Sequence, residues 1–81
     1  MPTVLRVANL RFYFFSNEGP RAHIHVGPLN GGEHPQMKIW LDTLEVAFLR
    51  GFSKKAEKDI LKFVTKNKEL FLSSWEEYFD D

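Results

Sequence analysis

Residues 22–26 read Ala-His-Ile-His-Val, and the alternation of imidazole and β-branched side chains in this run predicts a β-strand with two different faces. Successive side chains of a strand point to opposite sides of the sheet. Ile24 and Val26 are therefore expected in the core, while His23 and His25 share the other face. Because paired strands share the two faces of a sheet, this strand determines which face of its neighbours is turned towards the core.

Three more runs predict strands of the same sheet: residues 3–8, 11–16 and 37–41. Turn residues separate these runs, with Asn, Gly and Pro at 17–20 and a loop containing Gly and Pro at 27–35. Strands joined by such short connections pair with their neighbours in sequence. The predicted sheet is therefore a four-stranded antiparallel meander.

Regular alternation gives this sheet an outer face that mixes cations, imidazoles and aromatic rings. Its expected members are Arg6, His23, His25, Lys38, Trp40 and one aromatic pair of the second strand, either Phe12/Phe14 or Tyr13/Phe15. The opposite side of the fourth strand carries Met37, Ile39 and Leu41, which are expected in the core.

The C-terminal half changes to helical spacing. Leu44, Ala47 and Phe48 predict a short helix that Gly51 ends through a left-handed cap, and Ser53 is placed to cap the next helix. Apolar residues then recur mostly every three or four positions until the end of the chain, but a polar stretch at 65–68 interrupts them. The expected fold is α+β, with one long or two shorter C-terminal helices packed on one face of the sheet.

Length and composition are those of one small domain, residues 1–81, with an aromatic content of 15%. The chain has no cysteine, which excludes disulfides and thiolate metal sites, and it shows no signal peptide or apolar run of membrane length. Eleven Lys and Arg balance eleven Asp and Glu. We therefore expect a cytoplasmic protein that does not interact with membranes and has no global attraction to nucleic acid.

One functional hypothesis is a ribonuclease-like surface. Two imidazoles titrate near neutral pH, so His23 and His25 could serve as general base and acid, while Lys38 and Arg6 stabilise the charge on a phosphoryl group. Trp40 could stack on an RNA base. This chemistry requires no metal or other cofactor.

The second hypothesis is a binding surface, since exposed aromatics with scattered charge are typical of protein interfaces. Tyr13 and Trp40 would contribute from the sheet, and a homodimer that packs sheet to sheet would also cover this face. Lys54, Lys58 and Lys62 recur at four-residue spacing on the predicted helix, where they would track a phosphate backbone or an acidic protein, or form a solvated face.

A metal site is the third hypothesis. Two histidines at i and i+2 on one strand suit Zn²⁺ when a loop supplies a third ligand, and His34, Glu33 or Glu18 could do so. If a metal binds, we expect His23, His25 and His34 to hold it. The absence of cysteine and of a His-Glu-x-x-His pattern makes this the least favoured of the three hypotheses.

Several strings along the chain are similar to one bacterial family. They are Met1-Pro-Thr-Val-Leu-Arg6, Arg11-Phe-Tyr-Phe-Phe-Ser-Asn-Glu18, His23-Ile-His25-Val, Lys38-Ile-Trp40-Leu-Asp42, Arg50-Gly-Phe-Ser53 and Trp75-Glu-Glu-Tyr-Phe79. In this order they resemble the family called domain of unknown function 4160, over essentially the whole chain. Relatives commonly have prolines before the His-x-His, whereas this chain has Gly19-Pro20-Arg21-Ala22.

The resemblance implies a partner but no established activity. Members are often encoded beside a second small protein and are proposed to form toxin–antitoxin-like pairs. We therefore expect an interaction component of such a module, with a cognate small protein as partner, and RNA as the substrate in the ribonuclease alternative.

Overall fold

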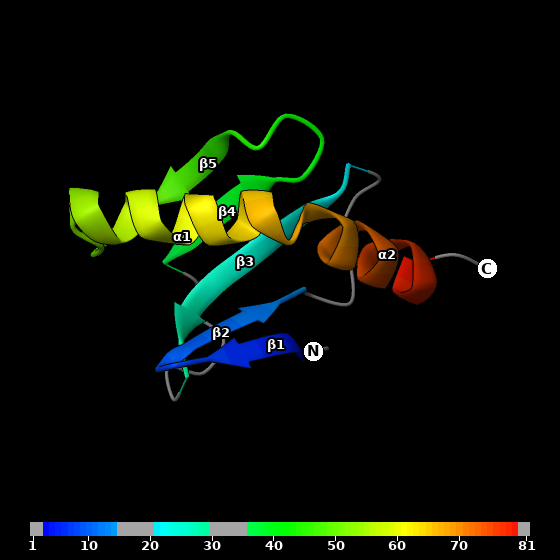
Figure 1. The fold of residues 1–81 in the computed structure, drawn as a ribbon, viewed down its shortest axis with the longest axis horizontal. Coiled ribbons are helices and arrows are strands. Elements are labelled where there is room, and N and C mark those ends of the chain that lie inside the picture. Colours follow the sequence, from blue (N-terminus) through cyan, green and yellow to red (C-terminus); the bar gives the residue numbers. More distant parts are fainter. Residues whose placement is uncertain (1–2, 15–20, 30–35, 80–81) are drawn as a thin grey trace.

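The computed structural model describes residues 3–14, 21–29 and 36–79, apart from the side chain of Thr3. Five strands come first and two helices follow (Figure 1). The strands are β1 (Thr3–Val7), β2 (Leu10–Tyr13), β3 (His23–Pro28), β4 (Met37–Trp40) and β5 (Val46–Leu49), and the helices are α1 (Lys54–Lys66) and α2 (Lys68–Phe79).

The sheet is an antiparallel meander in the order β1-β2-β3-β4-β5. This confirms the predicted topology and adds one strand to it. Each strand pairs with its neighbours in sequence, which makes β3 the central strand; its first five residues are buried. The α+β class, with helices that follow the sheet, is as predicted.

The fifth strand corrects one prediction. The spacing of Leu44, Ala47 and Phe48 predicts a helix, but residues 46–49 instead pair with β4. Leu44 has a positive φ of 63°, which redirects the chain after β4, and its amide donates to the Trp40 carbonyl at 2.8 Å. Four apolar residues in a row fit either period, and pairing with an existing strand decides between them.

The helical region is divided at Asn67, so the alternative with two helices is confirmed. Ser53 caps α1 as predicted, because its hydroxyl oxygen accepts a hydrogen bond from the Ala56 amide at 3.1 Å. At the other end the Asn67 side chain donates to the Phe63 carbonyl at 2.9 Å. This bond satisfies a carbonyl at the helix terminus, and α2 starts one residue later.

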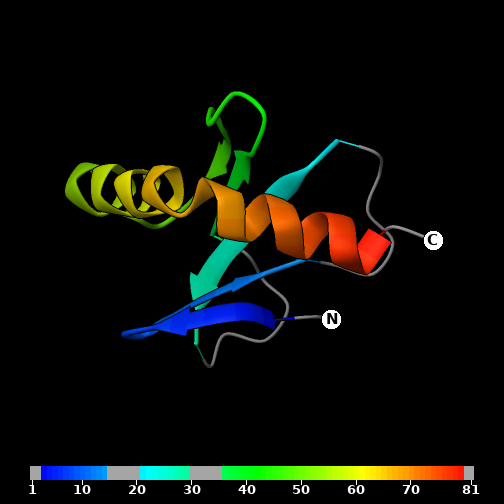
Figure 2. The same ribbon diagram turned by 45° about the vertical axis from the view of Figure 1, so that its right-hand side comes forward.

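Both helices cover the same face of the sheet (Figures 1 and 2). The core lies between the two layers and consists of Phe12, Phe14, Ile24, Val26, Met37, Ile39, Leu41, Ile60, Val64, Phe71 and Trp75. The predicted inward side of the strands is thereby confirmed, and the open choice on β2 is settled: Phe12 and Phe14 face the helices and Tyr13 faces away. Phe15 lies outside the described residues.

Gly51 connects β5 to α1 with a φ of +85°. Its left-handed backbone is as predicted, although it follows a strand and not a helix. A Cβ at this position would lie 3.1 Å from the Gln36 Nε2 atom, so the site is also crowded. Neither helix is long and apolar enough to cross a membrane, within the part of the chain that the structure describes.

Candidate functional site

The face of the sheet opposite the helices carries the residues that the sequence singles out. We call it the open face and define it by Arg6, Arg11, Tyr13, His23, His25, Lys38, Trp40 and Phe48. The register aligns Tyr13, His25, Lys38 and Phe48 in one row across β2, β3, β4 and β5. His23 and Trp40 form a second pair beside this row. The meander thus brings together residues up to 35 positions apart in sequence.

The two imidazoles share one face of the sheet, as predicted, but they are not surface groups. Their ring centroids are 5.0 Å apart in an edge-to-face arrangement, and the Tyr13 ring lies 5.7 Å from that of His25. Only 3% of His23 and 6% of His25 is exposed. Aromatic neighbours on three sides account for this burial, since the His23 ring also lies 5.4 Å from Trp40 and 5.0 Å from Trp75.

The orientation of His23 is fixed by the main chain just before β3. Its Nδ1 lies 2.8 Å from the carbonyl oxygen of Arg21. A carbonyl oxygen only accepts hydrogen bonds, so Nδ1 carries a proton and Nε2 is the basic nitrogen of the neutral ring.

Arg21 also ties the start of β3 to the end of β4. Its guanidinium donates to both carboxylate oxygens of Asp42, with Nε–Oδ2 at 2.9 Å and Nη2–Oδ1 at 3.1 Å. The hydrogen bonds from Arg21 hold the pKa of the Asp42 carboxyl below its ordinary value of 3.8. Asp42 in turn accepts from the Thr43 amide at 2.8 Å.

Two cations lie over the ring of Trp40. The Arg21 Cζ atom is 4.1 Å from the ring centroid and the Lys38 Nζ atom is 4.4 Å from it. Both distances are those of cation–π contacts. These cations occupy part of the indole surface on which a base would stack, and the role of Trp40 in RNA binding stays a prediction.

Within the strands themselves, the charged side chains are all cationic, whereas the carboxylates of Asp42 and Glu45 lie just outside β4 and β5. The five described strands contain three cationic side chains, Arg6, Arg11 and Lys38, and no carboxylate. Arg11 lies over the Tyr13 ring at 4.1 Å. Arg6 is exposed on β1, three strands from Lys38, which is a separation of about 14 Å between strand axes. The structure therefore does not place Arg6 and Lys38 on either side of one scissile phosphate beside the imidazoles.

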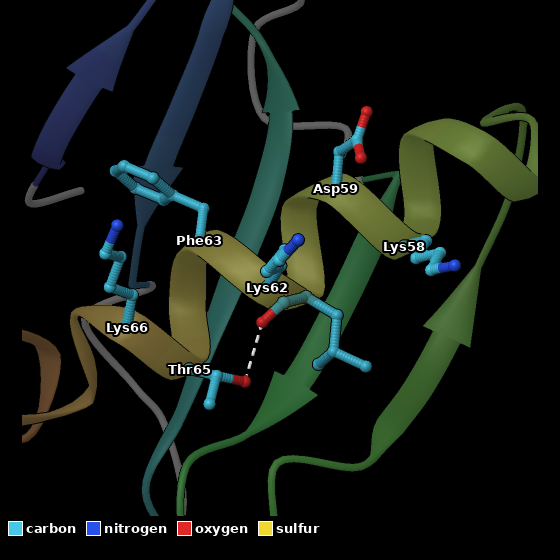
Figure 3. A pocket seen from close by; sticks show the side chains of 7 residues that line it. Lys58, Asp59, Lys62, Phe63, Thr65 and Lys66 are labelled. Atoms are coloured by element: carbon cyan, nitrogen blue, oxygen red, sulfur yellow. Dashed lines mark hydrogen bonds between the residues drawn. The ribbon is translucent and has the colours of Figure 1, made fainter.

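The predicted lysines lie elsewhere. Lys54, Lys58 and Lys62 are exposed on α1, which covers the other face of the sheet, so they do not share a surface with Tyr13 and Trp40. A hollow of about 740 Å³ lies beside this helix, and Figure 3 draws the side chains that line it. Its described lining is Lys58, Asp59, Leu61, Lys62, Phe63, Thr65 and Lys66.

The metal hypothesis stays a prediction. His34, Glu33 and Glu18 lie outside the described residues, and within the described ranges no three histidine or acidic side chains come close enough to hold an ion. The His23–His25 pair alone supplies at most two ligands, fewer than the three protein ligands of a catalytic zinc site.

Sequence reasoning missed Arg11, Arg21 and Asp42 as members of this region. A signal for them existed: Arg21 is two residues before His23 and Asp42 is two residues after Trp40, so both have the parity of the open face. Their contact follows only from the register of β3 with β4, which alternation by itself does not specify.

Comparison with known proteins identifies a family but no curated protein and no solved structure. A search of curated proteins found no match, and neither did a search of solved structures. The sequence model of the family described as Domain of unknown function (DUF4160) matches residues 9–76, from the β1–β2 turn into the last helix. The chain therefore belongs to the DUF4160 family.

Proposed function

We propose that this protein is the interaction component of a small bacterial two-protein module of the toxin–antitoxin kind, and that it works in the cytoplasm. The open face binds the cognate protein, and the partner presents an acidic surface to it. The observation that carries this proposal is the pair of cations, Arg6 and Lys38, that the described strands place on the open face.

The arrangement of the layers supports this assignment. Both helices lie on the opposite side of the sheet, although Trp75 of α2 reaches the His23 ring at 5.0 Å. Tyr13, His23 and His25 are buried, so a partner would contact the more exposed residues around them, such as Arg6, Lys38 and Trp40. Cations around such a surface would steer an acidic partner and fix its orientation.

The test is a binding titration with the protein encoded next to this one, measured by calorimetry at low and at high salt. Charge reversal by Arg6→Glu and by Lys38→Glu should each weaken the complex about tenfold or more, because like charges then face each other in the interface. The matched control is Lys58→Glu on α1, which removes an exposed cation from the opposite layer.

The control should leave the affinity within about twofold. Affinity that falls equally for all three variants would assign binding to net charge and refute a specific open-face interface. A neighbour protein that does not bind at all would remove the two-protein proposal.

A ribonuclease-like activity is the second candidate, favoured by one observation. His23 and His25 lie with ring centroids 5.0 Å apart, and Lys38 is the cross-strand neighbour of His25. One imidazole would remove the proton of a ribose 2′-hydroxyl as it attacks phosphorus, and the other would protonate the departing 5′-oxygen, giving a cyclic phosphate. Lys38 would stabilise the charge on the phosphoryl oxygens.

Burial makes this candidate the weaker one. A catalytic imidazole must come within about 3 Å of the reacting proton, yet at most 6% of either histidine is exposed. The test is growth after induced expression of the intact protein and of a His23→Ala/His25→Ala variant, with the fold of both checked by circular dichroism. Arrested growth with the intact protein alone, accompanied by cyclic-phosphate ends on cellular RNA, would favour the enzyme over the interaction domain.

A further inference from the structure

The edge strand β5 carries a pattern that the proposed function does not use. We propose that β5 is an interface between two copies of this chain, which pair antiparallel along it across a two-fold axis at Phe48. The two five-stranded sheets then become one continuous sheet. This contact lies at the edge of the sheet and has Phe48 in common with the open face.

The strand is apolar and exposed. β5 reads Val-Ala-Phe-Leu, and 37% of Phe48 and 38% of Leu49 is accessible to solvent. β5 is the last strand of the described sheet, with β4 on one side. Exposed apolar edge strands without a charge or proline inside them are templates for pairing with another strand.

Two main-chain hydrogen bonds show which backbone groups of this segment are already used. The Arg50 amide donates to the Gln36 carbonyl at 2.8 Å, and the Glu45 carbonyl accepts from the Trp40 amide at 2.9 Å. Hydrogen-bonded and non-hydrogen-bonded pairs alternate along an antiparallel ladder. The ends of the strand are therefore anchored to β4 at residues 45 and 50.

Val46 and Leu49 lie next to these anchored positions, opposite Ile39 and Met37. By the same alternation they occupy non-hydrogen-bonded pairs, so their amides and carbonyls point away from β4. They are the donors and acceptors that a new strand would use. In a two-fold arrangement, Val46 of the first copy exchanges two hydrogen bonds with Leu49 of the second. On the other side of the axis, Leu49 of the first copy exchanges two hydrogen bonds with Val46 of the second.

A β-bulge makes the side chains self-complementary in this register. Lys38 pairs with Phe48 while Ile39 pairs with Val46, so Ala47 is the extra residue. In a regular strand, residues 45 and 50 would point to opposite sides of the sheet, because they are an odd number of positions apart. The extra residue shifts the alternation by one position, so Glu45, Phe48 and Arg50 lie on the same side.

With the axis at Phe48, the two Phe48 side chains face each other. Glu45 of each copy then lies opposite Arg50 of the other. This charge complementarity, repeated on both sides of the axis, identifies a second copy as the occupant of the edge and not an unrelated peptide.

Charge reversal tests the register. We expect the intact protein to dimerise reversibly in sedimentation experiments up to about 1 mM, and Glu45→Arg or Arg50→Glu alone to weaken the dimer about tenfold or more, because each places two like-charged pairs in the interface. An equimolar mixture of the two variants should dimerise again, since every cross-strand pair is then opposite in charge.

A single cysteine tests the position of the axis, and the chain has no cysteine of its own. Phe48→Cys should cross-link readily in oxidised glutathione, because directly opposite residues of a non-hydrogen-bonded pair lie about 4.5 Å apart between Cα atoms. Leu49→Cys is the matched control, since it is equally exposed but faces Val46 of the other copy.

Each result decides the matter. A protein that stays monomeric at the highest concentration, charge variants that dimerise like the intact chain, or equal cross-linking at the two positions would each overturn the proposal. The variants keep the main-chain bonds to β4, and circular dichroism of each confirms its fold. Loss of the dimer with unchanged affinity for the cognate protein would separate this edge contact from the open face.

Discussion

The packing of α2 against the sheet gives a stability prediction that can be worked from the structure. Phe71 is 0% exposed, and its ring lies 5.6 Å from that of Phe12 and 6.5 Å from that of Phe63. Burial of an aromatic side chain removes roughly 150 to 250 Å² from water, worth about 4 to 6 kcal/mol. Alanine keeps part of this burial but leaves a cavity, so Phe71→Ala should lower the free energy of unfolding by about 3 to 5 kcal/mol.

That loss is large for a chain of this length, whose total stability is expected to be about 4 to 12 kcal/mol. Urea denaturation followed by far-ultraviolet circular dichroism is the assay. With a slope of roughly 1 kcal/mol per molar urea, the midpoint should fall by about 3 to 5 M. A variant that is already partly unfolded without urea would also agree with this predicted loss of stability.

The neighbouring residue provides the control. Leu70 lies on the same helix but is 45% exposed, so Leu70→Ala should change stability by less than about 1 kcal/mol. Equal losses of stability at the two positions would contradict the orientation of α2, in which Phe71 faces the core and Leu70 faces solvent. A small loss at Phe71 would show that α2 does not contribute to the core through this ring.

Three further predictions concern single positions. Ser53→Ala should cost about 0.5 to 2 kcal/mol because an amide at the start of α1 loses its acceptor, and Ser53→Asp should restore most of it in thermal denaturation. Gly51→Ala should destabilise by about 1 to 2 kcal/mol in urea, because a residue at φ +85° is strained and its Cβ crowds Gln36; an unchanged midpoint would contradict that backbone. Asp42 has a lowered pKa in the folded protein, so the pair with Arg21 stabilises the fold above pH 3.8, and this contribution disappears as the pH falls through the folded pKa. Carbon-detected NMR titration should place the Asp42 midpoint below 3.8, and Asp42→Asn should remove this acid-dependent part of the stability curve.

Strand alternation predicts the sides of the sheet but not its width. Ile24, Val26 and Ile39 are buried as expected, because a period of two does not depend on which strands pair. β5 was mistaken for a helix because four residues cannot separate a period of two from one of 3.6, and Leu44 at positive φ gives no signal in the sequence.

The candidate site likewise combines features that the sequence predicts with features that it does not. Membership of one face was predictable for His23, His25, Lys38 and Trp40, since it follows from parity alone. Their burial was not, because it depends on which rings the register brings alongside, such as Tyr13 beside His25. Packing across strands and layers is decided by tertiary contacts, and a linear pattern does not contain them.

The position of His23 between two indoles gives the protein a built-in optical reporter. Its ring lies 5.4 Å from Trp40 on the open face and 5.0 Å from Trp75 in the helical layer, and the chain has two tryptophans in all. A change in the charge or orientation of this imidazole therefore acts on every tryptophan fluorophore in the molecule. Replacing either tryptophan with phenylalanine would leave one emitter for each layer, so that events on the sheet and motions of α2 could be followed separately by fluorescence without an added label.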